Sequence, residues 1–234
     1  MLAETLCVNG LTFQVRPETT DIKALDEVIV RQGYALGGRL VVEPTDHWLD
    51  LGANIGAFSV WAASAGARVT AYEPEPDNFQ LLRQNILGYA VEARRAVVTA
   101  GITSTRLLYL CPNPDNRYRH HVKPTRGRKP LRVPAEQFAA VVATCQPNAI
   151  KMDIEGSEIG ILDATHDWGA VRKMVFEYHF DHDRSIPAFH GRVERLRQAF
   201  KVFHRPMPDA KTYDYFPAAT IVGCWRKTAE DGTG

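Results

Sequence analysis

The most constraining feature of this chain is an apolar segment that ends in a glycine-containing turn. Residues 48–58 read Trp-Leu-Asp-Leu-Gly-Ala-Asn-Ile-Gly-Ala-Phe, and small apolar residues follow as far as Ala65. This order predicts a buried strand, a tight turn, and a helix whose first N–H groups face the space beyond the strand. Gly52 and Gly56 both allow a ligand to approach the main chain closely. The segment therefore indicates a ligand pocket at a strand end.

An acidic residue follows this turn at an informative distance. Residues 68–72 form a second predicted strand, and Glu73 comes directly after it. An acidic side chain about 20 residues beyond such a turn can accept hydrogen bonds from both hydroxyls of a ribose. We therefore expect a cofactor that contains a nucleoside.

The spacing of the glycines narrows the choice of cofactor. Asp50-x-Gly52-x-x-x-Gly56 is neither the Gly-x-Gly-x-x-Gly turn that holds a dinucleotide pyrophosphate nor a triphosphate-binding loop. An acidic residue before the first glycine fits a cofactor with a positive end and no phosphate. S-adenosylmethionine (SAM), with its ammonium, sulfonium and carboxylate, meets this description. The alternative is that the glycines only allow a strand and a helix to pack closely.

Size and composition are those of one enzyme-sized domain. The chain has 234 residues and a net charge of +1, so its overall charge does not indicate a polyanionic partner. No apolar run approaches the about 20 residues of a membrane span, and the N-terminus lacks a basic region followed by an apolar one. Four cysteines without paired spacing indicate reduced thiols. We expect a cytoplasmic protein without membrane contact, and the sequence does not predict its oligomeric state.

Strand and helix patterns alternate along most of the chain. Asn9-Gly10 lies between two short apolar runs and predicts a hairpin. We expect a hairpin and helix in residues 1–40, a main domain in 41–227 with a basic loop insertion at 111–132, and a disordered tail at 228–234. Strands are expected near 96–98, 106–109, 149–152, 173–176 and 220–225, and helices near 20–33, 77–87, 135–144, 157–164 and 189–200. This alternation predicts an α/β fold with a doubly wound sheet.

Four acidic residues are expected at the ends of strands. They are Asp50, Glu73, Asp153 and Glu177. In a doubly wound sheet, ligands bind beyond the carboxyl ends of the strands. We therefore predict that these four carboxylates line one rim of the sheet.

Three segments resemble the signature stretches of the FkbM-type SAM-dependent methyltransferases. They are residues 50–56, residues 72–79 (Tyr-Glu-Pro-Glu-Pro-Asp-Asn-Phe) and residues 150–158 (Ile-Lys-Met-Asp-Ile-Glu-Gly-Ser-Glu). The resemblance implies a Rossmann-like, seven-stranded, mostly parallel sheet with helices on both faces. It also implies methyl transfer, usually to a hydroxyl oxygen of a sugar, polyketide or other small natural product. By position it places Asp50, Gly52, Asn54 and Gly56 around the methionine end of SAM, Glu73 at the ribose, and Asp153 near the methyl group.

Methyl transfer to a hydroxyl requires alignment and removal of a proton. Our hypothesis is that His179 is the base and that Asp153 or Glu177 orients it. Purely structural roles also fit these residues, because His179 can be a polar residue with all its hydrogen bonds made and Asp153 can accept hydrogen bonds from turn amides. A divalent metal at Asp153, Glu177, His179 or Asp181 would suit oxygen-preferring ions. We do not favour it, because proton removal without a metal explains the same residues.

A basic segment at residues 117–132 is the remaining candidate for substrate binding. It holds seven Lys or Arg and no acidic residue. Arg117, Tyr118, Arg119 and His120 could grip a phosphate and stack on a base, and Glu155 would contact the acceptor from the third signature. The alternative is a solvated loop whose charge aids solubility.

We interpret the chain as a SAM-dependent O-methyltransferase that acts on a small or phosphorylated hydroxyl compound. The first alternative is a 2′-O-methyltransferase acting on RNA or a nucleotide through the basic segment. A SAM-binding regulatory protein without turnover is an alternative from another class. A nicotinamide-dependent dehydrogenase is the third option. Fold and cofactor site do not specify the acceptor, so its identity is not predicted.

Overall fold

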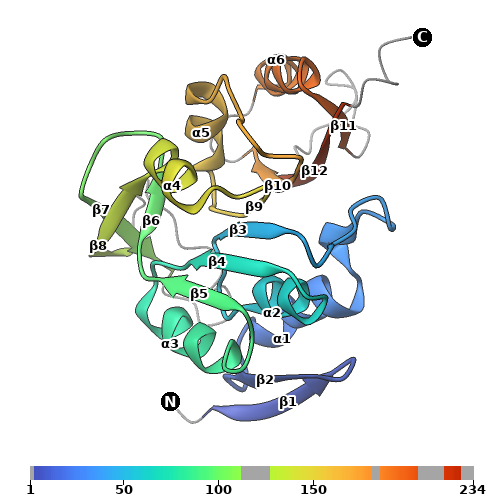
Figure 1. The fold of residues 1–234 in the computed structure, drawn as a ribbon. Helices are drawn as coiled ribbons and strands as arrows, with labels where there is room; N and C mark the ends of the chain where they lie inside the picture. The colour runs from blue at the N-terminus through green and yellow to red at the C-terminus, as the bar shows by residue number, and fades with distance from the viewer. Residues whose placement is uncertain (1–2, 112–126, 181–184, 205–218, 228–234) are drawn as a thin grey trace, which may run out of the picture.

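A computed structural model describes residues 3–111, 127–180, 185–204 and 219–227 of the chain. Its main sheet has seven strands in the order β11-β12-β10-β9-β3-β4-β5 (Figure 1). In chain order these are β3 (His47–Leu51), β4 (Arg68–Tyr72), β5 (Val91–Arg94), β9 (Ala149–Met152), β10 (Lys173–His179), β11 (Phe200–His204) and β12 (Ala219–Arg226). Strand β12 runs antiparallel to both of its neighbours, and the other pairs are parallel. The expected seven-stranded, mostly parallel sheet is confirmed.

Helices cover both faces of the main sheet (Figure 1). One face carries α1 (Asp21–Leu25) with the π-helical turn η1 (Asp26–Val30), α2 (Ala57–Ser64) and α3 (Pro76–Asn85). The other face carries α4 (Phe138–Cys145), α5 (Glu158–Ala164) and α6 (Ile186–Arg197). A short 3₁₀ helix, η2 (Gly33–Ala35), follows η1.

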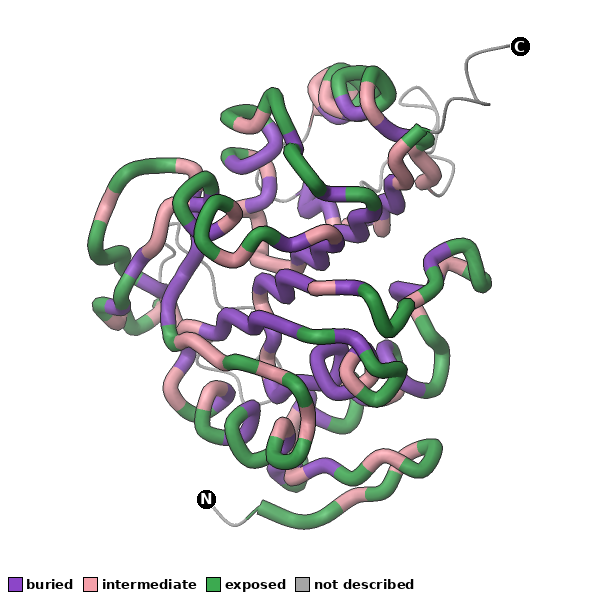
Figure 2. Tube along the Cα trace, viewed as in Figure 1, coloured by how far each residue is buried: buried purple, intermediate pink, exposed green. Residues whose placement is uncertain are grey.

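The central strand β3 is buried on both faces, as its continuous apolar pattern requires. Leu49 and Leu51 belong to the core cluster under α4, α5 and α6, whereas Trp48 belongs to the cluster under α1, α2 and α3. Side chains alternate along a strand, so Asp50 points to the same side as Trp48, toward α2. The buried tube of the central strands in Figure 2 shows how little of this sheet meets solvent.

The N-terminal hairpin forms as the sequence predicts. β1 (Glu4–Val8) and β2 (Leu11–Val15) pair in antiparallel fashion around Asn9 and Gly10, which have φ values of +49° and +80°. Positive φ at both central residues is the requirement of a tight hairpin turn. Phe13 and Val15 are fully buried in the same core cluster as α2.

Two predicted helix boundaries are wrong. A small sheet of β6 (Val97–Thr99), β8 (Lys129–Gln137) and β7 (Thr105–Leu110) was not expected. Because β8 extends to Gln137, α4 begins at Phe138 and not at Ala135. The last helix ends at Arg197, since residues 200–204 pair with β12 as β11. Pairing with a distant strand overrides local pattern in both places.

The structure also bears on the basic insertion and on membrane contact. The end of the insertion, from Lys129, forms part of β8, whereas residues 112–126 and the predicted tail at 228–234 lie outside the described residues.

Among the described helices, none has the length and apolar character needed to cross a membrane. Within the described ranges, none of the four cysteines forms a disulfide bond.

Candidate active site

The glycine turn after β3 is shaped by close approach of two backbone segments. Gly52 has a φ of +77°, and a Cβ atom at this position would lie 1.8 Å from the carbonyl oxygen of Asp153. Gly56, with a φ of +95°, begins α2, and its Cβ would lie 2.8 Å from Leu82 Cδ1 in α3. Both positions therefore require glycine, because the turn is pressed against the loop after β9 on one side and against α3 on the other.

A buried ion pair holds this turn. Lys151 Nζ lies 3.1 Å from Asp50 Oδ1 and donates to the carbonyl oxygen of Gly52 at 2.7 Å. Ser59 Oγ donates to the other oxygen of Asp50 at 2.6 Å. Burial alone would lower the pKa of Lys151, but the charge of Asp50 and then of Asp153 raises it above its usual range. Lys151 is thus a cation that links the turn to the third signature stretch.

A cleft of about 650 Å³ opens beside this turn. The lining residues come from the glycine turn, the end of β4, β6, β7 and the loop after β9: Leu51, Gly52, Asn54, Tyr72, Glu73, Pro74, Asn78, Ala96, Val97, Val98, Leu108, Asp153, Ile154, Glu155 and Ser157. Asp50 and Gly56 are not among them. They support the wall of the cleft from behind.

Glu73 is the buried carboxylate of this cleft. The backbone N–H of Asn54 donates to Oε2 at 2.8 Å, and the backbone N–H of Glu75 donates to Oε1 at 2.9 Å. Burial raises the pKa of Glu73 to about 7, although both hydrogen bonds act in the opposite direction. A carboxylate has about four acceptor positions, so each oxygen can accept one further hydrogen bond.

His179, at the end of β10, is fixed by a residue that the sequence analysis did not assign to the site. Glu158 Oε1 lies 2.9 Å from Nδ1 of the imidazole and accepts the His179 backbone N–H at 2.8 Å. Glu158, and not Asp153 or Glu177, therefore orients the ring. Burial would lower the pKa of His179, but the hydrogen bond and charge of Glu158, then the charges of Glu155 and Asp153, raise it to about 10.

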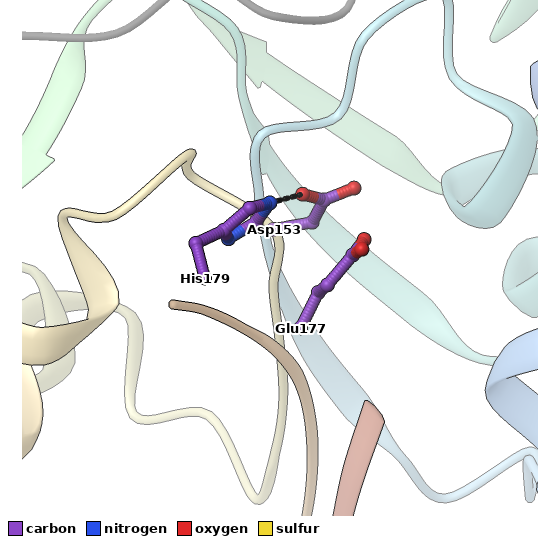
Figure 3. Close-up of side chains that lie close together, drawn as sticks. All are labelled: Asp153, Glu177 and His179. Carbon is purple, nitrogen blue, oxygen red and sulfur yellow. Dashed lines mark ion pairs between the residues drawn. The ribbon is translucent and has the colours of Figure 1, made fainter. Parts of the chain in front are cut away.

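Asp153 lies between the cleft and His179. The hydroxyl of Tyr34 in η2 donates to Asp153 Oδ2 at 2.9 Å, and Oδ1 is 3.9 Å from His179 Nε2. Glu177, two residues before His179 in β10, faces the same space (Figure 3). Burial and the nearby charge of Asp153 raise the pKa of Glu177 to about 8. One polar cluster therefore adjoins the cleft.

The structure places the predicted site residues in three groups. Gly52, Asn54, Glu73, Asp153 and Glu155 line the cleft, whereas Glu177 and His179 join Asp153 in the adjoining polar cluster. Asp50 and Gly56 lie behind the turn. The predicted substrate residues Arg117, Tyr118, Arg119 and His120, together with Asp181, lie outside the described residues.

Three residues of the site were not predicted. Lys151 and Glu158 belong to the third signature stretch, and a lysine inside a buried strand could have been recognised as a cation in need of a partner. Tyr34 could not have been found in this way, because 119 residues separate it from Asp153 along the chain.

Comparison with known proteins gives the family. A model of the methyltransferase FkbM domain matches residues 50–202. A search of curated proteins found no match to this chain. The structure of a fibrillarin/Nop5p complex aligns with a TM-score of 0.51 and 13% identity, over 95% of this chain and 97% of that one.

Two further solved structures are similar to a lesser degree. TYW2 of M. jannaschii in complex with AdoMet has a TM-score of 0.49 and 14% identity, over 96% of this chain and 87% of that one. The tRNA (uracil-54, C5)-methyltransferase of Pyrococcus abyssi in complex with S-adenosyl-L-homocysteine has a TM-score of 0.49 and 11% identity, over 95% of this chain and 44% of that one. Identities this low concern the fold alone. The family model, however, covers most of the chain and includes the turn, Glu73 and the polar cluster, so the chain belongs to the FkbM methyltransferase domain family.

Proposed function

We propose that this protein transfers a methyl group from SAM to a hydroxyl oxygen of a small-molecule acceptor. The observation that carries the proposal is the position of Asp153. This residue lines the cleft beside the glycine turn and also belongs to the polar cluster with Glu177 and His179. A donor methyl group and an acceptor hydroxyl can therefore meet at a single carboxylate, and alignment of this kind supplies much of the rate of a displacement reaction.

The residues of the cleft fit SAM. Glu73 has one free acceptor position on each oxygen, as two ribose hydroxyls require. Apolar side chains, including Pro74, Val97 and Leu108, surround the space beside it and suit a flat adenine ring. The turn at residues 52–54 and Asp153 would hold the methionine end. When bound, SAM supplies an electrophilic methyl group on a sulfonium.

The acceptor must lose a proton as its oxygen forms the new bond to carbon and the carbon–sulfur bond breaks. His179 was the base predicted from the sequence. With a pKa of about 10 its imidazole is already protonated at neutral pH and has no lone pair to offer. We therefore propose that the proton leaves to the carboxylates that lie next to Nε2 of His179, which are those of Asp153 and Glu155.

Thermal unfolding in the presence of S-adenosylhomocysteine tests the cofactor. A ligand that binds only the folded state raises Tm, because at a concentration one hundred times its Kd it adds about 2.7 kcal/mol to the free energy of unfolding. We expect this rise with S-adenosylhomocysteine and not with NADH. Glu73→Gln should reduce it. Glu194→Gln is a matched control, because Glu194 lies on the exposed face of α6 and pairs with Arg197.

Turnover separates an enzyme from a regulatory SAM-binding protein. SAM with a labelled methyl group is incubated with the protein and pools of hydroxyl compounds, phosphorylated sugars or RNA, and the product bond is identified by mass spectrometry. Label on a small-molecule oxygen supports the proposal. Label on RNA ribose would favour the 2′-O-methyltransferase alternative. A Tm rise without transfer to any pool would favour regulation, and a rise with NADH alone would refute the cofactor assignment.

A further inference from the structure

Three potential ligand atoms converge beside the cleft. One atom each from Asp153, Glu177 and His179 lies within 4.8 Å of the other two. Figure 3 shows the carboxylates of Asp153 and Glu177 side by side, with the imidazole edge directed at Asp153. Ligand atoms at about 2.1 Å from a single cation lie up to about 4.2 Å apart. Small side-chain adjustments therefore suffice for all three to reach one ion.

The imidazole is oriented as metal-binding histidines are. Glu158 occupies Nδ1, so Nε2 points into the cluster, where a metal ion would take the place of its proton. The ring is only 7% exposed, and Nε2 has no hydrogen bond to any described residue. Its nearest carboxylate oxygens are those of Glu155 at 3.4 Å and Asp153 at 3.9 Å. A carboxylate behind the ring, which fixes its orientation and raises its basicity, is the usual second partner of a metal-bound histidine.

The carboxylates of the cluster show the same pattern. Tyr34 holds one oxygen of Asp153, which leaves the other directed at the cluster. Within the described part of the chain, the Glu177 carboxylate has no hydrogen bond or ion pair, although this side chain is half-buried. Three carboxylates, those of Asp153, Glu155 and Glu177, face a single imidazole. Asp153 and Glu177 each direct an oxygen at the same small space, and a cation there would offset the repulsion between two carboxylates so close together.

We propose that Asp153, Glu177 and His179 together bind one divalent metal ion. Two carboxylate oxygens and one imidazole nitrogen suit a first-row ion such as Mn²⁺ or Fe²⁺, with the open positions left for water or a substrate oxygen. Sequence reasoning did not favour a metal here. Two features that the sequence does not show now favour it. Glu158 lies behind the imidazole, and no residue in the described ranges forms a hydrogen bond or ion pair with Glu177.

The role of the metal ion in the reaction rests on the proposed function, but the existence of the metal site does not. A divalent cation next to Asp153 would lower the pKa of an acceptor hydroxyl and fix the position of its oxygen. Glu155 lies beside His179 but is not one of the three converging ligands, so it remains to receive the proton. The acceptor class that follows is a compound with a hydroxyl and a second oxygen close enough to chelate one ion.

Direct metal binding is the test, independent of methyl transfer. The full chain is stripped with EDTA, desalted and titrated with Mn²⁺, and free Mn²⁺ is followed by electron paramagnetic resonance. We expect one Mn²⁺ per chain. Glu177→Gln and Asp153→Asn should weaken binding at least tenfold. Glu158→Gln should weaken it less, because this residue acts through the ring. The matched control is Glu194→Gln, which removes the same charge from the exposed face of α6 and should leave the affinity for Mn²⁺ unchanged.

The outcomes separate this proposal from the proposed function. A cooperative thermal unfolding transition like that of the wild-type chain shows that each variant is folded. If the wild-type chain binds S-adenosylhomocysteine but no Mn²⁺, the metal site is refuted and the methyltransferase proposal stands. Binding of Mn²⁺ that Glu177→Gln and Asp153→Asn leave unchanged also refutes the site, because the ion then sits elsewhere. Site-dependent Mn²⁺ binding without any response to S-adenosylhomocysteine would support the metal site and contradict the proposed cofactor.

Discussion

Replacing Glu73 by Gln should change how the stability of the protein depends on pH. Glu73 is 5% exposed, and burial raises its pKa from 4.5 to about 7. Between these two values the folded state binds more protons than the unfolded state. The free energy of unfolding therefore falls as pH rises through this window, and the destabilisation is fully present above pH 7. A carboxylate that destabilises the folded state in this way is consistent with a role in binding a ligand.

The magnitude follows from the size of the shift. Each pKa unit corresponds to about 1.4 kcal/mol, so the charge of Glu73 costs about 1 kcal/mol at pH 5 and about 3 kcal/mol at pH 8. The Gln variant lacks this dependence. Its amide also faces the backbone N–H of Asn54 or Glu75, but that penalty is the same at both pH values. Between pH 5 and pH 8 the free energy of unfolding of the variant should therefore rise by about 2 kcal/mol relative to that of the wild-type protein.

Urea denaturation at pH 5, 6, 7 and 8 measures this difference, with Glu194→Gln as the exposed control. A relative gain of about 2 kcal/mol corresponds to about 4–8 °C in Tm for a chain of this size. At pH 8 the same variant should bind S-adenosylhomocysteine about tenfold to a hundredfold more weakly, since hydrogen bonds to a charged group are lost. A stability difference that stays flat or reverses between pH 5 and 8 would refute the reasoning.

Three other substitutions have definite expected results. Lys151→Met should cost about 3–5 kcal/mol in urea denaturation by leaving the buried Asp50 without its cation, and adding Asp50→Leu should restore most of that loss. Gly52→Ala should lower the free energy of unfolding by at least about 3 kcal/mol and abolish the S-adenosylhomocysteine shift, because its Cβ would meet the Asp153 carbonyl. Tyr34→Phe should cost about 1 kcal/mol in thermal unfolding and reduce methyl transfer more than S-adenosylhomocysteine affinity.

The central strands and the cleft could be predicted because their signals are local. The continuous apolar pattern of residues 47–51 is that of a strand buried on both faces, and the acidic residue after residues 68–72 is now the buried carboxylate of the cleft. The predicted rim of four carboxylates at strand ends is correct for two of the four residues. Glu73 and Asp153 do follow strands directly, whereas Asp50 lies within β3 and Glu177 within β10.

The role of individual residues could not be predicted where it depends on packing between distant segments. Asp50 was expected at the cofactor, yet its side-chain direction and the cation at Lys151 place it behind the turn. Glu158 was not assigned to the site from the sequence. It begins α5, but its carboxylate reaches back to Gly156 and across to His179, 21 residues away. No local pattern encodes this contact.

The N-terminal segment completes the site although the family match begins after it. The matched region starts at residue 50, and Tyr34 lies before that point. Tyr34 is buried, packs edge-on against Phe58 of α2 at 5.8 Å between ring centroids, and donates its hydroxyl to Asp153. Lys151 Nζ lies 5.5 Å from the centre of the same ring. One side chain of the N-terminal segment thus contacts the turn's cation and also the carboxylate shared by the cleft and the polar cluster. The segment that carries η2 therefore contributes to the site directly, because Tyr34 is the donor that fixes the orientation of Asp153.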